Sequence, residues 1–328
     1  MTEQAGRIYL TGVAGMIGSN AARSLLEEGQ ELVGIDNLWK GTKNNIADLL
    51  SHKSFTFRHA DLISDQDWSR DMGPTDTLIH LADIVAGIGY VFDNEWSVFQ
   101  KNLLINTSVA RVVSYKKPGR FIYLGTACSY PQQLQRSVDT SVLSESSKFP
   151  ADPESGYGWS KLIGEIEFRL VTKNTNTRFT VLDLHNVYGW PCIYRDAASQ
   201  VIPSLIFKAL TATDRKLSVW GDGSQGRAFL HVSDVVSAIR LALRYSGMSS
   251  TFMIGPNYCT RISEVARIIQ AHPGINIQEI IFDVSKPIGD IGRFADSTLA
   301  SRELGWVPKV TLHSGVHELI DRIIDDRT

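Results

Sequence analysis

Short apolar runs alternate with longer polar or amphipathic segments through the first half of the chain. The apolar runs lie at 7–10, 31–36, 55–60, 77–82, 120–125 and 179–184. Runs of this length predict strands, and residues 19–28 between the first two have the periodicity of a helix. Strands that alternate with helices form parallel sheets, because each crossover needs room for a helix. The pattern predicts an α/β fold with a doubly wound parallel sheet of the Rossmann type.

The second half of the chain has a different pattern of apolar and polar segments. From about residue 185 the segments become shorter, and loops rich in Pro, Gly and aromatic residues separate them. We expect residues 1–184 to form the Rossmann domain and residues 185–328 to form a smaller C-terminal substrate domain over the carboxyl edge of the sheet. Segments from about 229–254 are expected to return to the larger domain.

A glycine-rich segment joins the first predicted strand to the first predicted helix. It reads TGVAGMIG and covers residues 11–18. In such a turn Gly12 permits the sharp change of direction, Gly15 lets the backbone approach a pyrophosphate, and Gly18 allows close helix packing. The N-terminus of the helix then faces the phosphates with its free N–H groups. The segment predicts a dinucleotide-binding site.

An acidic residue, Asp36, ends the second predicted strand. Its carboxylate can accept hydrogen bonds from an adenosine ribose and repels a 2′-phosphate. This favours NAD over NADP, with Lys40 and Lys43 as the nearby cations that could reverse the preference. The expected cofactor-binding residues are Gly12, Gly15, Met16, Ile17, Gly18, Asp36, Asn37, Asp61, Leu62, Leu81, Ala82, Asn102, Tyr157 and Lys161. For the four that end the third and fourth predicted strands, a purely structural position is an equally good interpretation.

Composition and charge argue against several classes of protein. The chain has 328 residues, of which 43% are hydrophobic, and a formal net charge of -2. General nucleic-acid and anionic-membrane binders need a basic surplus, which this sequence lacks. Its first residues lack the long apolar stretch of a signal peptide or a membrane span. Three cysteines without CxxC spacing indicate a cytoplasmic protein with neither disulfides nor bound metal as the default expectation.

A tyrosine and a lysine four residues apart carry the strongest chemical signal. Tyr157 and Lys161, in YGWSK, lie one turn apart on one face of a predicted helix. An ammonium group at that distance lowers the pKa of the phenol, which makes Tyr157 a usable base near neutral pH. The spacing alone also fits a solvated helix face. It gains weight from the glycine-rich segment and from TACSYP at 126–131, which precede it in the chain.

These segments together resemble the extended short-chain dehydrogenase/reductase family, and within it the nucleotide-sugar epimerases and dehydratases. The likeness covers nearly the whole chain, because HLADIVAGIGY at 80–90, HNVYG at 185–189, VWGDGSQGRAFLHVSD at 219–234 and IGRFADSTLASRELGWVP at 291–308 add to it. The resemblance implies an enzyme whose tightly held NAD takes a hydride from a sugar carbon, usually C4. It also implies Tyr157 as the base, Lys161 on the nicotinamide ribose and Thr126 in the proton network.

The residue two positions after Thr126 differs between branches of this family. Members that dehydrate or decarboxylate carry a glutamate at the similar position. The GDP-mannose 3,5-epimerases and GDP-fucose synthases carry a cysteine there, in a segment SCIYP that is similar to ACSYP with Cys128 in this chain. A carbonyl acidifies the C–H bond beside it, so a thiol or thiolate can remove and return that proton. We therefore expect Cys128 to be catalytic, with a small buried core residue as the other interpretation.

The resemblance to those two branches breaks down at Gln200. They carry a second acid or base, Lys or His, at the corresponding place before a segment like VIPSLI, and glutamine cannot transfer a proton at ordinary pH. A single inversion, or a different proton donor, becomes plausible. Cys192, Tyr194, Arg195 and Asp196 share the loop before Gln200, and each is a candidate replacement.

Two arginines match the family positions that hold the diphosphate of the substrate. They are Arg227 in GDGSQGRAF and Arg293 in DIGRFAD, and guanidinium groups suit phosphate oxygens. Trp220 is similar to a tryptophan of the GDP-sugar enzymes that lies near the base, although aromatic packing in a small core explains it equally well. The expected substrate-binding residues are Gly87, Asn186, Gln200, Val201, Trp220, Arg227 and Arg293.

The expected function is that of an NAD-dependent nucleotide-sugar epimerase, which oxidises C4 and moves a proton at C3, C5 or both. The domain of residues 1–184 would bind NAD, and that of residues 185–328 the nucleotide sugar. The alternatives are a 4-epimerase by hydride return alone, a dehydratase or reductase, and a non-catalytic NAD-sensing protein. Helices expected at 97–115 and 158–173 resemble those that form the dimer interface of the family, so the resemblance implies a homodimer.

Overall fold

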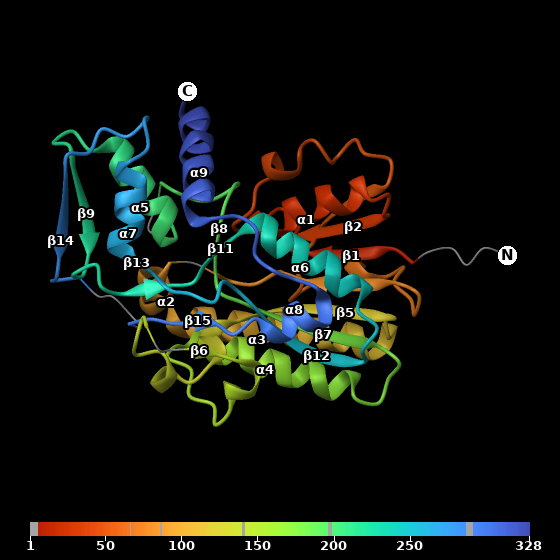
Figure 1. Cartoon of the computed structure of the whole chain (residues 1–328). Coiled ribbons are helices and arrows are strands. Elements are labelled where there is room, and N and C mark those ends of the chain that lie inside the picture. The colour runs from red at the N-terminus through yellow and green to blue at the C-terminus, as the bar shows by residue number, and fades with distance from the viewer. Residues whose placement is uncertain (1–5, 66, 86, 140–141, 196–198, 287–290) are drawn as a thin grey trace.

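Seven parallel strands form the central sheet of the molecule. The computed structural model describes residues 6–65, 67–85, 87–139, 142–195, 199–286 and 291–328 (Figure 1). The strand order is β12-β7-β5-β4-β1-β2-β3, and every neighbouring pair is parallel. The strands are β1 (Ile8–Thr11), β2 (Leu32–Asp36), β3 (Phe55–His59), β4 (Thr77–His80), β5 (Arg120–Thr126), β7 (Arg178–Leu184) and β12 (Ser249–Ile254). The order reverses between β1 and β4, which opens a crevice at the carboxyl ends of the strands.

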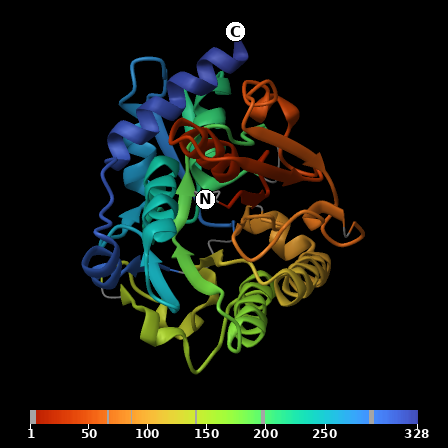
Figure 2. The same cartoon turned by 90° about the vertical axis from the view of Figure 1, so that its right-hand side faces the viewer.

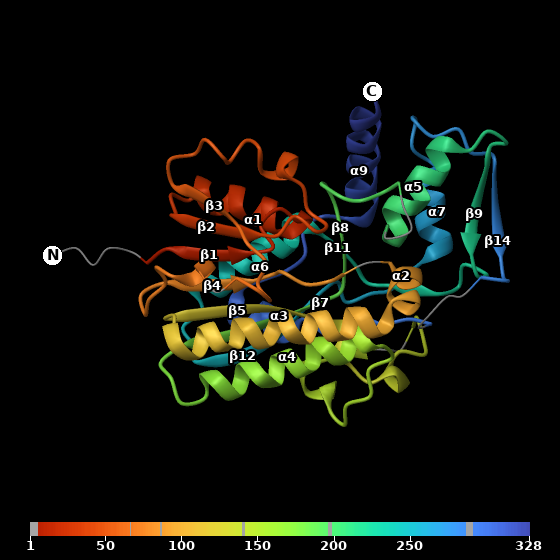
Figure 3. The ribbon, with the colours of Figure 1, turned by 180° about the vertical axis from the view of Figure 1, so that it is seen from behind.

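Helices cover both faces of this sheet (Figures 2 and 3). They are α1 (Met16–Glu27) and α6 (Val232–Arg244) on one face, and α3 (Glu95–Lys116) and α4 (Gly156–Thr172) on the other. Leu25 of α1 shares a buried cluster with Phe252 of the sheet, and Phe168 of α4 shares another with Phe121. In the part of the chain that the structure describes, no helix combines the length and the apolar character needed to cross a membrane.

A separate hydrophobic cluster lies beyond the carboxyl edge of the sheet. It is built from α5 (Val201–Thr211), α7 (Ile262–Gln270), α9 (Leu312–Arg327) and the parallel pair of β9 (Lys216–Trp220) and β14 (Glu279–Asp283). Figure 1 shows β9, β14, α5 and α7 together at one end of the molecule. The remaining elements are α2 (Ile88–Asp93), α8 (Thr298–Leu304), β6 (Val142–Leu143), β8 (Asn186–Tyr188), β10 (Gly226–Arg227), β11 (Phe229–His231), β13 (Thr260–Arg261), β15 (Phe294–Ala295), and the 3-10 turns η1 (Lys43–Ile46), η2 (Asp67–Ser69), η3 (Ala127–Ser129), η4 (Gln132–Leu134) and η5 (Glu145–Lys148).

The predicted α/β fold class is confirmed, and the six predicted strands all join the central sheet. Part of the second half of the chain also belongs to this layer. Helix α6 packs beside α1, and β12 pairs with β7 along its whole length. Farther along, α8 and Trp306 join the cluster under α1 and α6. The chain therefore crosses more than once between its two parts, and their assignment to cofactor and substrate stays a prediction.

A buried network of charges joins β7 to α4. Lys148 Nζ lies 2.5 Å from Glu165 Oε2 and 2.6 Å from Asp183 Oδ2, and the Tyr130 hydroxyl donates to the same Asp183 oxygen at 2.8 Å. The side chains of the three charged residues are no more than 6% exposed. Burial raises the pKa of Asp183 to about 6, although the Lys148 charge opposes the increase. The network fixes α4 against the end of the sheet, and α4 carries Tyr157.

Replacing Lys148 by methionine should destabilise the protein by about 3–5 kcal/mol, because the buried Asp183 loses the lysine charge and Glu165 keeps only its pair with Arg169. The free energy of unfolding in urea measures this loss. The loss should shrink below about pH 6, where Asp183 takes up a proton and no longer carries an unpaired charge.

The control is Lys216→Met, which removes an exposed ion pair with Glu279 at 3.0 Å. Exposed pairs contribute about 0–1 kcal/mol, so this variant should unfold almost like the parent protein. Equal effects of the two substitutions would contradict a structural role for the buried network.

Candidate active site

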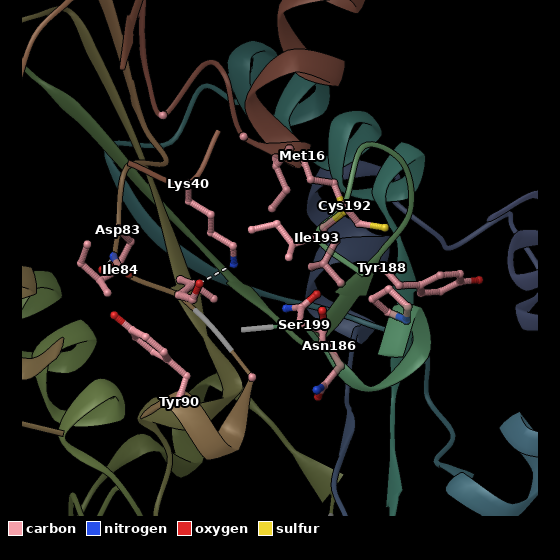
Figure 4. A pocket seen from close by; sticks show the side chains of 18 of the residues that line it. Met16, Lys40, Asp83, Ile84, Tyr90, Asn186, Tyr188, Cys192, Ile193 and Ser199 are labelled. Atoms are coloured by element: carbon pink, nitrogen blue, oxygen red, sulfur yellow. Dashed lines mark hydrogen bonds between the residues drawn. The ribbon is translucent and has the colours of Figure 1, made fainter. Parts of the chain in front are cut away.

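One large cleft, of about 1650 Å³, opens at the carboxyl ends of the central strands. Both parts of the fold line it. Figure 4 shows Asp83 and Ile84 on one side and Cys192 and Ile193 on the other, with the side chain of Lys40 extending between them. The cleft therefore lies between the Rossmann layer and the loop that leads into α5.

The cleft brings together all but one of the residues predicted for the site. Those that line it are Gly12, Gly15, Met16, Ile17, Gly18, Asp36, Asn37, Asp61, Leu62, Leu81, Ala82, Gly87, Thr126, Cys128, Tyr157, Lys161, Asn186, Gln200, Val201, Trp220, Arg227 and Arg293. The exception is Asn102, which is completely buried. Its side-chain amide accepts from the N–H of Ile84 at 2.8 Å and donates to the carbonyl of Ile84 at 3.2 Å. Asn102 thus holds the loop after β4 and does not face the cleft.

The glycine turn after β1 has the geometry to receive a pyrophosphate. Gly12 has a φ of +73°, and a Cβ there would lie 2.8 Å from the backbone nitrogen of Ala82. A Cβ on Gly18 would lie 2.1 Å from the carbonyl oxygen of Gly12, so only glycine lets α1 pack this closely. Among the described residues, no side chain caps the N-terminus of α1 and its first turn holds no acid. The residues present therefore fit the diphosphate of a dinucleotide.

Asp36 lies at the ribose end of this site. Its Oδ2 accepts from the N–H of Ala14 at 2.9 Å, and its Oδ1 accepts from the N–H of Leu38 at 2.8 Å. Burial raises the pKa of Asp36, and these two hydrogen bonds oppose the increase. Lys40 instead donates to the carbonyl oxygen of Val85, on the loop after β4 (Figure 4). The loop thus engages the nearby cation, which agrees with NAD as the bound dinucleotide.

Tyr157, Lys161 and Thr126 meet in the cleft, as the sequence predicts. The pKa of Tyr157 is raised well above its ordinary value, whereas the spacing to Lys161 predicted a lower one. Burial is the largest cause, and the charges of Asp83 and Cys128 add to it, while the side chain of Thr126 opposes the increase. The predicted lowering of this pKa is therefore wrong.

A carboxylate pairs with Lys161. Asp83 Oδ2 lies 2.9 Å from Lys161 Nζ, and the two side chains are 5% and 6% exposed. An opposite charge at this distance offsets part of the field that the ammonium group exerts on its surroundings. Asp83 was not among the residues predicted from the sequence. Its signal was its position, three residues beyond the end of β4 at the carboxyl edge of the sheet.

Arg293 connects the candidate acid/base to the candidate diphosphate site. Its Nη2 donates to Sγ of Cys128 at 3.1 Å, and its Nη1 donates to Oε1 of Gln135. Arg293 is only 5% exposed, so this contact is well shielded from water. The backbone N–H of Cys128 donates to the Thr126 hydroxyl at 3.2 Å. One turn of chain therefore presents both the sulfur and the hydroxyl partner of Tyr157 to the cleft.

The loop between β8 and α5 holds the four candidate replacements for a second acid or base. Of its four candidates, Asp196 lies outside the described residues. Burial and the charge of Asp326 raise the pKa of Cys192 to about 12. The Tyr194 hydroxyl donates to Asp326 Oδ2 at 2.5 Å, and Arg195 Nη2 donates to the Tyr194 oxygen at 2.6 Å. Cys192 therefore stays a thiol, and Tyr194 and Arg195 are engaged with the C-terminal helix α9.

A flat, partly polar surface surrounds Trp220 in the cleft. Trp220 is 40% exposed, and the ammonium group of Lys208 on α5 lies 5.3 Å from its ring centroid. Gln225 donates to the carbonyl of Trp220 at 2.7 Å, and its buried Oε1 has no hydrogen-bond partner among the described residues. An exposed ring, a cation and a buried acceptor suit a heterocyclic base. Trp220 was predicted from the sequence, whereas Lys208 and Gln225 were not. Gln225 lies within the family-like segment 219–234, and Lys208 lies in none of the quoted segments.

His185, at the end of β7, is a further titratable group in the lining that the sequence analysis did not single out. Burial lowers its pKa to about 3, with the nearby Arg293 charge as the second cause. Neither ring nitrogen has a hydrogen-bond partner among the described residues. The imidazole is therefore neutral and available for a polar contact.

Comparison with known proteins accounts for this arrangement. The sequence matches the NAD dependent epimerase/dehydratase family over residues 8–255. GDP-mannose 3,5-epimerase 1 of Oryza sativa subsp. indica is 30% identical over 310 residues, which are 94% of this chain and 79% of the relative. The UDP-glucuronic acid 4-epimerase from Bacillus cereus, solved in complex with UDP-glucuronic acid and NAD, is 25% identical with a TM-score of 0.82 and covers 97% of this chain and 99% of its own.

A second solved structure shows the same fold at lower identity. The UDP-glucose 4-epimerase of Thermotoga maritima with UDP-glucose has a TM-score of 0.84 at 22% identity, over 98% of this chain and 100% of its own. The predictions of an enzyme and of NAD as its cofactor are confirmed by the family match and by the Bacillus cereus structure. The chain belongs to the NAD dependent epimerase/dehydratase family.

Proposed function

We propose that this enzyme epimerises a nucleotide sugar by oxidising C4 transiently and then removing and returning a proton at a neighbouring carbon. When bound, NAD accepts the C4 hydride and later gives it back. Tyr157 takes the C4 hydroxyl proton, and Thr126 favours the ionised phenol. Lys161 would hold the nicotinamide ribose. The C4 ketone acidifies the neighbouring C–H bonds, and Cys128 takes the proton from one face of such a carbon; a proton returned to the opposite face of the planar enolate completes the inversion.

The contact between Arg293 and Cys128 supports this proposal most strongly. A guanidinium 3.1 Å from the sulfur forms a charge-assisted hydrogen bond to a thiolate and also binds phosphate oxygens. Arg227 lines the same cleft and can share the diphosphate. The sugar is attached directly to that diphosphate, so a sulfur beside the diphosphate site is within reach of the sugar. A cysteine packed only for its volume has no need of such a contact.

We expect one inversion in each turnover. The position at which relatives carry a second acid or base holds Gln200, whose amide cannot act as an acid or a base at ordinary pH. Cys192 stays a thiol, and Tyr194 is bonded to Asp326. Cys128 is then the one assigned base, so we expect proton exchange at one of the two carbons next to C4, with solvent as the source of the proton that enters from the opposite face.

The proposed substrate is a GDP-sugar. Guanine offers N–H donors to the unpartnered Oε1 of Gln225 and acceptor atoms to the ammonium group of Lys208, and its two fused rings cover more of Trp220 than uracil does. The rice relative is named for a GDP-sugar, which supports the choice. UDP-sugars are the main competitors, because the Bacillus cereus structure holds one.

The proposed assembly is a homodimer formed through α3 and α4. These helices lie side by side on one face of the sheet (Figure 3). Their exposed large apolar residues are Trp96, Leu104, Tyr115, Trp159, Ile163, Ile166 and Leu170. A surface with this many apolar side chains is typical of a protein interface.

The reaction can be tested with a panel of GDP-, UDP-, ADP-, CDP- and dTDP-sugars incubated with the enzyme in D2O. We expect a new isomer of a GDP-sugar with deuterium at C3 or C5 but not at both, as measured by proton NMR and mass spectrometry. Cys128→Ser should reduce deuterium incorporation by at least about 100-fold, the range typical of a lost proton-transfer group, while NAD stays bound.

The matched control is Cys259→Ser, since Cys259 does not belong to the lining of the cleft. This variant should incorporate deuterium at the parental rate. A new isomer without any label would contradict the role of Cys128, and it would identify a 4-epimerase that works by hydride return alone.

The homodimer predicts a clear response to a charge placed in its interface. Ile166 is 40% exposed on α4, and a carboxylate buried there in an interface is strongly unfavourable. Ile166→Asp should therefore sediment as a monomer at concentrations where the parent protein is a dimer. Val284→Asp, at a side chain that is 76% exposed on a segment of the other part of the fold, is the control and should stay dimeric. A monomeric parent protein would exclude the proposed assembly.

A further inference from the structure

Asp83 is a buried carboxylate that the proposed reaction does not use. Its Oδ2 forms the ion pair with Lys161, and its Oδ1 accepts from the N–H of Ile84 at 2.9 Å. Asn102 of α3 grips Ile84 through both its N–H and its carbonyl. The carboxylate is therefore held from the sheet edge and from α3. It lines the same cleft as Lys161 and Tyr157.

Besides burial, four groups are the main electrostatic influences on the phenol of Tyr157. The groups that act on its phenol are Asp83 from the loop after β4, Thr126 and Cys128 from the turn after β5, and Arg293 from the segment before β15. Asp83 and Cys128 raise the pKa of Tyr157, and Thr126 and Arg293 lower it.

Several groups surround the ammonium group of Lys161, and Asp83 is the one that carries a negative charge. The ammonium group lies 4.2 Å from the ring centroid of Tyr123, whose hydroxyl donates to the carbonyl of Lys161. The pKa of His80 is lowered to about 3, first by burial and then by Lys161, so this imidazole carries no charge near neutral pH. The ion pair with Asp83 thus offsets part of the positive charge of Lys161, and the carboxylate itself raises the pKa of the phenol.

We propose that Asp83 is a positioning residue that neutralises and orients Lys161, so that Tyr157 stays a protonated phenol until another positive charge enters the cleft. The proposal deepens the proposed function and rests on Tyr157 as its base. The oxidised nicotinamide ring carries one positive charge and the reduced ring carries none. The base is therefore ready when the cofactor can accept a hydride, and it stays protonated when the cofactor cannot.

This coupling would keep the two half-reactions in order. Deprotonation of the C4 hydroxyl is useful only beside an oxidised cofactor. Once the hydride has been transferred, the positive charge is lost, and the phenol holds its proton until the hydride returns to the ketone. Without Asp83, the unopposed charge of Lys161 would favour the phenolate in both states.

The test measures the ionisation of Tyr157 directly, so it does not require a known substrate. Tyrosinate absorbance is titrated against pH, and the same titration of Tyr157→Phe is subtracted. In Asp83→Asn the transition should move to lower pH by on the order of one unit, because a like charge is removed and Lys161 is no longer neutralised. Asparagine retains an oxygen for the N–H of Ile84 and is close to aspartate in shape, so the loop can stay in place.

The double variant Asp83→Asn, Lys161→Met removes both charges and leaves neither one buried without a partner. Its Tyr157 transition should return close to that of the parent protein. Glu165→Gln is the matched control. Glu165 lies one turn after Lys161 on α4 and forms a buried pair with Lys148. Removing its charge should leave the pH of the Tyr157 transition unchanged. NAD added to the parent protein should lower the transition, whereas NADH should not.

Two results would overturn the proposal. One is a folded Asp83→Asn variant, with the parental circular dichroism spectrum and NAD content, whose Tyr157 transition is unchanged or moves to higher pH. The other is an equal response of the parent protein to NAD and NADH. Neither result depends on whether the enzyme epimerises a GDP-sugar. An absence of deuterium exchange combined with the expected titrations would instead reject the proposed reaction and leave the role of Asp83 standing.

Discussion

The cleft depends on charges that are paired inside the protein along one helix. Helix α4 carries Lys161 and Glu165 on its buried side, and each has an opposite charge within 2.9 Å. An unpaired charge at either position would cost several kcal/mol, so each pair forces a distant segment into place. Asp83 brings in the loop after β4, and Lys148 brings in the segment before α4. The phenol and the ammonium group therefore face the cleft at fixed positions.

The fold could be predicted because it depends on local sequence patterns, namely short apolar runs and glycine turns. The short apolar runs that form strands can be recognised one by one, and Gly18 is required by a contact with Gly12 inside the same turn. The side-chain environment of the site depends on contacts between distant segments. Arg293 contacts Cys128 although 165 positions separate them in the sequence, and no periodic pattern predicts that contact.

The incorrect prediction for the pKa of Tyr157 has the same origin. Helical spacing places Lys161 beside the phenol, but it says nothing about what else surrounds the ammonium group. Burial is the largest cause of the raised pKa, and the carboxylate of Asp83, from the loop after β4, adds to it. Asn102 is a comparable case. An asparagine on a helix near the cleft looks like a ligand in the sequence, whereas its amide is used completely by the backbone of Ile84.

The end of helix α9 has a practical consequence for work with the protein. Asp326 and Arg322 both line the cleft, and Asp326 accepts the hydrogen bond from Tyr194. Helix α9 therefore forms part of the cleft wall and also holds the loop that leads into α5. A substitution on this helix would change the width of the cleft without touching any residue that carries the chemistry.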